Sequence, residues 1–311
     1  MDKELEAVHA AILKLDSDGS RTARVLRNTL DQLYDGQRTG RYRWDQLYKT
    51  EKTHCGTLVE INLHREFEFE DGKDLDYKIA GVDVDCKYSQ GLYEWMIPQE
   101  AREKLCLVVW ADDQKAVWKM GVVRARAELL GALNRDQKAR LNSQGKEAIT
   151  WIFQDVPLPP NVLLQLDPEI VDKIMGYKSG QKSINELFRN TLGMRVGRGV
   201  IATVAQQNDY MKRVRGNGGA RTALQPEGII ILGQYESHRE IARNLGVQKP
   251  ERGESISVKL AVASPEDKDV AMIAGRRWRI AKIGDPVVPA PMVPKPPAVV
   301  STLRAKKHLS R

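Results

Sequence analysis

The segment 76–87, which reads DYKIAGVDVDCK, carries residue types that could hold a metal ion beside a phosphate. Within it, Ile79-Ala80-Gly81 separates two short runs and predicts the turn of a β-hairpin. Side chains alternate between the two faces of a strand, so Asp85 and Lys87, two residues apart, share one face. Asp76 can reach the same face across the hairpin. The segment therefore predicts two carboxylates and an ammonium group at one place.

Hydrolysis of a phosphodiester is the chemistry that such a group of side chains favours. Mg²⁺ prefers oxygen ligands, commonly a couple from the protein, with water and phosphate filling the other positions. A neighbouring lysine can orient or deprotonate the attacking water and offset the charge that builds on the phosphorus centre. Asp-x-Lys alone is a common spelling, however, so a solvated acidic hairpin with a chance lysine stays open as the alternative.

A third acidic residue, Glu60, lies on a helix that the sequence predicts just before the hairpin, within residues 56–66. Leu58 and Ile61 have the spacing of an apolar helix face. A helix that packs by this face brings Glu60 near the acidic strand. Together with Asp76 and the hairpin, Glu60 favours the metal-dependent nuclease interpretation.

The charge of the chain is unevenly distributed. The chain has 311 residues, enough for about two domains, and is 41% hydrophobic and 29% charged, as is ordinary for a soluble protein. Its net charge is +8 and its pI about 9.3. Residues 1–155 hold 24 Lys+Arg and 27 Asp+Glu, a net of −3, whereas residues 156–311 hold 25 and 14, a net of +11. A metal-site half beside a strongly basic half fits an enzyme that acts on nucleic acid.

Cysteine usage and the amino terminus indicate a cytoplasmic protein. The three cysteines, Cys55, Cys86 and Cys106, form no CxxC pair and no metal-finger spacing, so we expect reduced thiols. The first residues are acidic and lack the apolar stretch of a signal peptide. No apolar run approaches the roughly 20 residues that span a bilayer, so we expect no association with membranes.

Residues 1–155 predict a first domain of mixed α and β structure, in which helices flank a small sheet. Apolar spacing predicts two packing helices, and continuous apolar runs predict buried strands; a further helical pattern with Asn and Gly breaks follows. These elements are helices at 3–15 and 22–33, strands at 105–110 and 117–123, and the broken helical pattern at 124–149. The basic segment 38–52 interleaves Tyr42, Trp44 and Tyr48, which suits phosphate and base contacts or, equally, a surface loop with aromatic anchors.

A proline-rich segment at 156–161 predicts a linker, because three prolines in four positions disfavour helix and interior strand alike. Beyond it, residues 162–284 predict a second domain. Ser183 and Glu186 have the spacing of a capping box and predict a helix that runs to Leu192 and stops at Gly193. Residues 285–311 contain six prolines and several basic residues and predict a basic tail.

The second domain contains a pattern typical of a helix-turn-helix. A short helix is predicted for residues 200–206, and Asn208 can cap a basic third helix that runs to Gly216. Strands are predicted at 228–233, 255–264 and 277–283. Six basic residues but one acidic residue, Asp209, lie between positions 194 and 221, which favours DNA contact over a merely solvated helix face. The candidate DNA-binding residues are Arg198, Asn208, Lys212, Arg213, Arg215 and Arg221, with Arg195 also in the basic cluster.

The chain resembles the NaeI family of type IIE restriction endonucleases over essentially its whole length. Long runs in both halves carry the resemblance, and they are far more specific than Asp-x-Lys alone. The matching runs are 31–40, 50–54, 56–67, 84–87, 201–207, 211–216 and 226–233. Segments 89–104, 124–185 and 234–274 match more weakly.

The resemblance implies an α+β fold with two domains. The amino-terminal domain would have the PD-(D/E)xK nuclease fold, and the carboxy-terminal domain would resemble the winged helix-turn-helix of catabolite-activator-type regulators. The family's catalytic set falls on Glu60, Asp76, Asp85 and Lys87. Asp76 and Asp85, with the backbone carbonyl of Cys86, would hold Mg²⁺, while Glu60 would complete the outer shell or hold a second ion.

The resemblance also implies a partner and a regulation. A homodimer would bind double-stranded DNA at a palindrome, with GCCGGC the best guess, because two-fold protein symmetry matches a two-fold site. A second copy of the DNA would bind the carboxy-terminal domain as effector. A methyltransferase would belong to the same restriction-modification system, and we expect no direct contact with it.

Two other functions remain open from the sequence. A MutH-like repair nickase would share the nuclease core but cut one strand, so a supercoiled plasmid would stop at the nicked circle. A DNA-binding regulator with a vestigial nuclease domain would bind and never cut. The intact set of Glu60, Asp76, Asp85 and Lys87 argues against the regulator, because a retired site has no physical need for clustered like charges.

Overall fold

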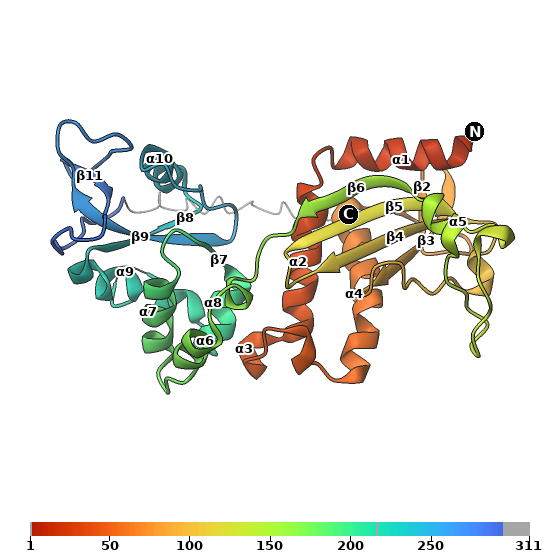
Figure 1. Cartoon of the computed structure of the whole chain (residues 1–311), viewed down its shortest axis with the longest axis horizontal. Coiled ribbons are helices and arrows are strands. Elements are labelled where there is room, and N and C mark those ends of the chain that lie inside the picture. Colours follow the sequence, from red (N-terminus) through yellow and green to blue (C-terminus); the bar gives the residue numbers. More distant parts are fainter. Residues whose placement is uncertain (1, 216, 295–311) are drawn as a thin grey trace, which may run out of the picture. The chain divides into compact units, whose positions relative to one another are not determined.

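The computed structural model describes residues 2–215 and 217–294 (Figure 1). Its contacts divide the chain into two compact units, Met1–Asn190 with Val196–Val214 and Thr191–Arg195 with Arg215–Arg311. Most of the tail expected at 285–311 therefore lies outside the described residues. Among the described residues, no helix is long and apolar enough to cross a membrane.

A six-stranded sheet forms the centre of the first unit (Figure 1). Its strands lie side by side in the order in which they occur in the chain. They are β1 (Glu70–Asp71), β2 (Tyr77–Ile79), β3 (Val82–Ser89), β4 (Leu105–Asp112), β5 (Val117–Arg124) and β6 (Thr150–Pro157). Only the pair β3–β4 is parallel; the other described pairs are antiparallel. The predicted strands at 105–110 and 117–123 are confirmed.

Hydrophobic side chains cover both faces of this sheet. On one face, Val84 and Leu107 pack in a core with the helices α1 (Lys3–Leu15), α2 (Ser20–Tyr34) and α4 (Lys49–Phe67). On the other face, Cys106 and Val108 pack in a second core with residues of the segment that follows β3. Alternation along β4 thus supplies both layers, and β4 itself is almost fully buried.

The predicted helices at 3–15 and 22–33 are confirmed as α1 and α2. The Asp2 side chain caps α1 by accepting a hydrogen bond from the backbone N–H of Leu5 at 3.2 Å. The helical pattern expected at 124–149 is wrong, since this segment contains only short helices. The short helices of the first 157 residues are α3 (Gly36–Thr39), η1 (Trp44–Gln46), η2 (Gln99–Ala101), η3 (Ala127–Leu129) and α5 (Ser143–Glu147).

Helices follow the sheet in the chain, and the predicted bounds of the helix from Ser183 to Leu192 are wrong. Val156 and Pro157, expected in the linker, are the last residues of β6. The helix expected to start at Ser183 begins at Gly180 and ends at Asn190. The N–H of Ser183 already donates to the Ser179 carbonyl at 3.0 Å, and Ser183 is buried, so it does not stand at the helix start. The elements are η4 (Val162–Leu164), α6 (Pro168–Met175), α7 (Gly180–Asn190), α8 (Arg198–Ala205) and η5 (Tyr210–Arg213).

The prediction of a basic third helix after Asn208 is also wrong. A single 3-10 turn, η5, replaces it, and Asp209 rather than Asn208 occupies the N-cap position. The Asn208 side chain instead accepts a hydrogen bond from the Gln37 side chain at 3.2 Å. The contacts divide the chain near residues 190–214, and the domain boundaries expected from the sequence stay a prediction.

The second unit is built on a smaller sheet. The five-stranded sheet has the order β10-β11-β9-β7, and β8 also pairs with β9. Its strands are β8 (Ile229–Gly233), β9 (Glu254–Val262), β10 (Ala271–Ile273) and β11 (Arg276–Ile280), and the helices of the unit are α9 (Ala220–Ala223), η6 (Gln225–Glu227) and α10 (Glu236–Asn244). Of β7 (Arg195–Gly197), only Arg195 belongs to this unit. The three strands predicted here are confirmed, whereas α10 and β10 were not expected.

A buried ionic cluster ties α2 to the carboxyl end of β4. The guanidinium of Arg27 donates hydrogen bonds to both carboxylate oxygens of Asp113, and Tyr34 donates its hydroxyl proton to Asp113 at 2.7 Å. Arg27 also pairs with Asp31 at 2.8 Å. Burial disfavours the charge on Arg27, but Asp31 and Asp113 outweigh burial and raise its pKa. Arg27 therefore stays charged, and its hydrogen bonds to Asp113 fix α2 on the sheet.

We expect the substitution Asp113→Ala to reduce the free energy of unfolding of the chain by about 3–5 kcal/mol, because it leaves the Arg27 guanidinium buried beside fewer partners. The matched control is Lys115→Ala, which removes an exposed ammonium paired with Asp112 and should cost less than about 0.5 kcal/mol. Urea denaturation measures both. Equal midpoints for the two variants would contradict a structural role for the cluster.

Candidate active site

The predicted hairpin is confirmed and has a two-residue turn. Ala80 and Gly81 both adopt left-handed backbone conformations, with φ of 51° and 81°, as turns that match the twist of a hairpin require. The register pairs Tyr77 with Val84, so Asp76 stands across from Asp85. This register therefore places Asp85 of β3 beside Asp76, the residue that precedes β2.

Oxygen atoms of three residues converge on the ammonium group of Lys87. Its Nζ lies 2.7 Å from Asp85 Oδ1, 3.1 Å from the Cys86 carbonyl oxygen and 3.8 Å from Asp76 Oδ2. Asp76 is fixed in turn, because its Oδ2 accepts a hydrogen bond from the Cys86 N–H at 2.7 Å. The structure thus brings together Asp76, Asp85 and Lys87 as the sequence predicted, with the Cys86 carbonyl among them.

Glu60 belongs to the same electrostatic group. Burial raises the pKa of Glu60, and the nearby negative charge of Asp76 raises it further. The backbone of Glu60 is held by Tyr77, whose fully buried hydroxyl donates a hydrogen bond to the Glu60 carbonyl oxygen at 2.7 Å. Tyr77 thereby joins α4 to the hairpin. The sequence analysis missed Tyr77, although its place next to Asp76 was a signal that it lies at the site.

Burial sets the charge balance of the cluster. Asp85 is 3% exposed, and burial raises its pKa to about 6 against the opposing attraction of Lys87, with the Asp76 charge adding to the rise. Burial lowers the pKa of Lys87, but Asp85 and Asp76 outweigh it, so this pKa lies above its ordinary value. Lys87 is therefore an ammonium ion at neutral pH, and Asp85 titrates close to neutrality.

The donor atoms fit a hard divalent metal ion. Two carboxylates and one carbonyl, all hard oxygen donors, surround the ammonium group of Lys87. Oxygen donors of this kind are the ligands that Mg²⁺ prefers. Three side chains of the metal-binding types His, Cys, Asp and Glu do not meet at ligand distances anywhere in the described part of the chain. A metal ion bound here would therefore need the Cys86 carbonyl oxygen as well as the carboxylates of Asp76 and Asp85.

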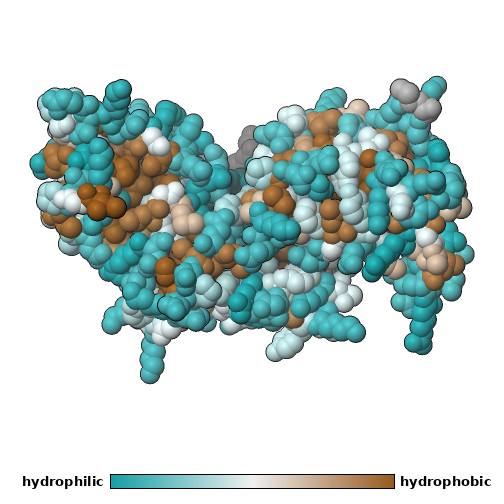
Figure 2. All heavy atoms as spheres, in the orientation of Figure 1, coloured by the Kyte–Doolittle hydropathy of each residue, from teal (hydrophilic) through white to brown (hydrophobic). Residues whose placement is uncertain are grey.

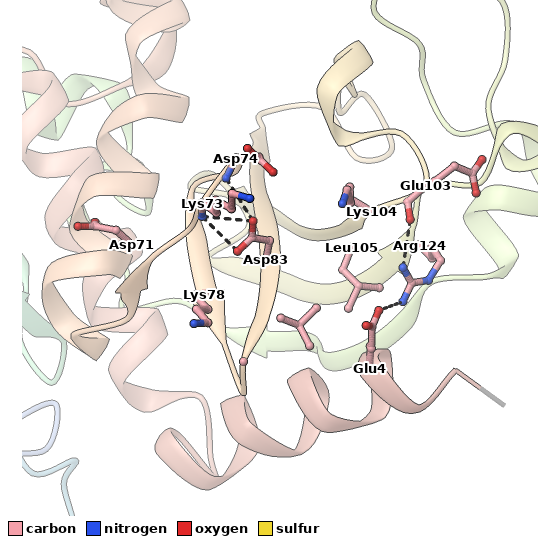
Figure 3. A pocket seen from close by; sticks show the side chains of 12 residues that line it. Glu4, Asp71, Lys73, Asp74, Lys78, Asp83, Glu103, Lys104, Leu105 and Arg124 are labelled. Carbon is pink, nitrogen blue, oxygen red and sulfur yellow. Dashed lines mark hydrogen bonds and ion pairs between the residues drawn. The ribbon is translucent and has the colours of Figure 1, made fainter.

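A pocket of about 600 Å³ lies beside the hairpin turn, yet it is not this cluster (Figure 3). Acidic and basic side chains line it together, and none of the four predicted catalytic residues does. Among its lining residues, Asp83 accepts hydrogen bonds from the backbone N–H groups of Lys73 and Asp74, each at 3.2 Å. Its mixed charge gives no preference for a phosphate.

The predicted DNA-binding residues lie in both compact units and differ in their partners. In the first unit, Arg198 donates to the Tyr210 hydroxyl at 2.6 Å and Arg213 to the Gln207 side chain at 2.7 Å. Lys212 pairs with Asp209. In the second unit, Arg221 donates to the Ile231 carbonyl at 2.9 Å, while Arg215 is exposed. Their contact with DNA stays a prediction, and the partner of Arg221 gives it a structural role as well.

Segment 38–52 is partly structural. Arg41 forms two hydrogen bonds to Glu51, at 2.7 and 2.8 Å, and so fixes the segment on the amino-terminal turn of α4. The side chain of Arg38 is 83% exposed and Tyr48 is 73% exposed. A basic and aromatic surface therefore remains beside the helix that carries Glu60.

Comparisons with known proteins cover nearly the whole chain. A family model described as restriction endonuclease NaeI matches residues 6–289. The chain is 51% identical over 302 residues to the type II restriction enzyme NaeI of Lentzea aerocolonigenes, an alignment that spans 94% of this chain and 95% of that protein.

The pKa of Asp85 predicts how the stability of the metal-free protein depends on pH. Because this pKa rises from 3.8 to about 6 on folding, ionised Asp85 disfavours the folded state, so its stabilising contribution is present below pH 4 and lost as the pH rises through 6. Relative to wild type, Asp85→Asn should therefore gain about 2–3 kcal/mol between pH 4 and pH 7.5. Urea denaturation at several pH values measures this difference.

The matched control for this titration is Asp83→Asn. Backbone N–H groups of Lys73 and Asp74 hold the pKa of the half-buried Asp83 below its ordinary value, so ionised Asp83 favours the folded state. This variant should lose stability relative to wild type as the pH rises through 4, the opposite sign. A difference between wild type and Asp85→Asn that stays constant from pH 4 to pH 8 would contradict the burial of an ionisable Asp85.

Proposed function

Because the chain belongs to the NaeI family of type II restriction endonucleases, a group of site-specific deoxyribonucleases, we propose that it makes Mg²⁺-dependent double-strand cuts in the palindrome GCCGGC. The single observation that carries the assignment of the site is the convergence of Asp76, Asp85 and the Cys86 carbonyl on the Lys87 ammonium. Restriction endonucleases generally use a divalent metal ion, and hard oxygen donors make Mg²⁺ the best fit.

In this proposal, Asp76, Asp85 and the Cys86 carbonyl hold the metal ion, and Glu60 completes the outer shell or holds a second ion. The bound ion would lower the pKa of a water molecule and polarise the phosphodiester. Lys87, an ammonium ion at neutral pH, orients the attacking water and offsets negative charge on the phosphate oxygens. The water oxygen forms the new bond to phosphorus as the bond to the leaving deoxyribose oxygen breaks in line with it.

The carboxy-terminal part would bind a second copy of the DNA as effector. From α7 to β9 the elements are α7, β7, α8, η5, α9, η6, β8, α10 and β9, and the short helices that precede the strands β8 and β9 support a winged helix-turn-helix there. The net charge of +11 over residues 156–311 supports a polyanionic ligand. The proposed homodimer matches the two-fold symmetry of a palindrome, and a methyltransferase of the same system would protect the site without contacting the enzyme.

The catalytic assignment predicts that Asp85→Ala or Lys87→Ala lowers cleavage by several orders of magnitude, because each side chain acts on the transition state. DNA binding should survive. The matched control is Asp83→Ala, on the same strand but outside the cluster, with less than about a tenfold effect expected. Plasmid cleavage in Mg²⁺, followed by sequencing of the ends, measures the cleavage rate of each variant. The same assay distinguishes double-strand cutting from the action of a nickase, which would stop at the nicked circle. Near wild-type cutting by Asp85→Ala would falsify the site.

The effector assignment predicts slow cutting of a one-site plasmid and roughly 5–150-fold faster cutting when a short cognate duplex is added. The triple variant Lys212→Ala/Arg213→Ala/Arg215→Ala should lose this stimulation but keep the basal rate. A control that removes three other exposed cations of the carboxy-terminal part, Lys249→Ala/Arg252→Ala/Lys268→Ala, should keep the stimulation. Equal rates for one-site and two-site plasmids at dilute DNA, with no response to added duplex, would refute the assignment.

A further inference from the structure

Residues 130–141 form a hairpin, here termed the 130–141 arm, that the sequence had predicted as part of a broken helical pattern. Leu130 and Leu141 pair as an antiparallel bridge, and the Gly131 N–H donates to the Arg140 carbonyl at 2.8 Å. At the tip, the Asn134 side chain accepts from the N–H groups of Asp136 and Lys138, each at 2.9 Å. The arm is thus a two-stranded ribbon with a closed turn and an internally bonded tip.

The base of the arm is fixed to the body of the first unit. Ile97 and Ala139 exchange two backbone hydrogen bonds, at 2.8 and 3.0 Å, and Ile97 is fully buried. The Asn142 side chain donates to the Glu128 carbonyl at 2.7 Å and closes the base from the other side. Ile97 and Leu141 belong to the hydrophobic core that also contains Cys106. The base of the arm is therefore fixed from both sides.

This core lies on the face of the sheet to which the catalytic residues point. Asp85 pairs with Cys106 in the parallel register of β3 and β4, so their side chains leave the sheet on the same face. The Cys106 sulfur lies 3.9 Å from Asp85 Oδ2, in agreement with this register. The arm therefore rises from the layer that borders Asp85 and Lys87. In Figure 1 it extends toward the bottom of the view, as the amino-terminal end of α4 does.

The tip of the arm is exposed and positively charged. Residues 131–138 are exposed throughout, and Figure 2 shows a hydrophilic projection at this place in the molecule. The arm contains three cations, Arg135, Lys138 and Arg140, against one acid, Asp136. Arg140 is paired with Glu94 at 3.7 Å, whereas no carboxylate partner is described for Arg135 or Lys138. Exposed cations without acidic partners, on a ribbon beside a phosphodiesterase site, fit a polyanion.

We propose that the 130–141 arm grips the substrate duplex, with Arg135 and Lys138 contacting backbone phosphates of the DNA that is held at Asp85 and Lys87. The inference rests on the proposed function and deepens it, because it assigns a substrate contact that lies outside the basic segments found in the sequence. A two-stranded ribbon is also narrow enough to enter the major groove, so phosphate contacts at its tip can set its depth and register there.

The double variant Arg135→Ala/Lys138→Ala of the full chain tests the arm. Only the DNA bound at Asp85 and Lys87 is cut, so the KM for cleavage reports substrate binding apart from effector binding. Loss of two phosphate contacts should raise KM by about tenfold or more and lower the slope of log KM against log salt by about two units. The kcat should stay within about twofold, because neither side chain touches the reacting atoms.

Two further variants make the outcome specific. The charge-conserving swap Arg135→Lys/Lys138→Arg should retain the wild-type salt slope. Lys14→Ala/Arg24→Ala removes two exposed cations from α1 and α2 and should leave KM and the slope unchanged. An equal effect in this control would overturn the assignment in favour of net charge alone.

The remaining outcomes separate this inference from the function on which it rests. A wild-type chain that cuts in Mg²⁺, together with an unchanged KM and slope in the double variant, would overturn the arm assignment alone. A wild-type chain that cuts no DNA would overturn the proposed function and the arm assignment with it. A shift in sedimentation of the double variant without a change in KM would assign the arm to a contact between copies of the chain and overturn its role on DNA.

Discussion

Carboxylates repel one another most strongly where water is scarce. The hairpin β2–β3 must hold Asp76 and Asp85 close together in spite of that repulsion. Asp85 is almost fully buried beside Asp76, and Glu60 adds a third acidic group. Lys87 offsets part of the repulsion, and the N–H of Cys86 fixes Asp76. Charged groups remain buried only when their partners are held in good geometry. The surrounding structure must therefore keep β2, β3 and α4 in one fixed arrangement.

Three contacts meet this requirement from different directions. Tyr77 joins the hairpin to the backbone of α4. Hydrophobic cores on both faces clamp β3 and β4, so the parallel register that sets the direction of Asp85 cannot slip without moving an entire layer of side chains. The Arg27–Asp113 cluster holds α2, against which α4 packs. Each contact lies away from the oxygen atoms of the site, yet each limits how far those atoms can move apart.

Patterns within short segments of the sequence predicted the elements that depend mainly on neighbouring residues. The alternation along β3 and the turn at Ala80-Gly81 were sufficient to place Asp85 and Lys87 together, and apolar spacing was sufficient for α1 and α2. Long-range contacts decided the rest. The spacing of Ser183 and Glu186 is typical of a capping box at the start of a helix. In the structure, however, Glu186 pairs with Lys173 at 2.6 Å, and the helix begins earlier, at Gly180. The hydrogen bond from Tyr77 to Glu60 and the anchoring of the 130–141 arm at Ile97 depend on partners that only the folded chain brings near.

The position of α1 has a consequence for how the chain matures. The hairpin and α4 precede β5 and β6 in the chain, so they are synthesised earlier, and a domain can begin to fold while synthesis proceeds. Yet α1 packs on β5 and β6, and Asp2 pairs with Arg124 at 2.9 Å, so the first helix must wait for the last strands of its sheet. Until β6 has been synthesised, α1 lacks part of the sheet surface on which it packs. The part of the sheet that carries Asp85 and Lys87 is therefore complete in sequence before the strands that hold α1.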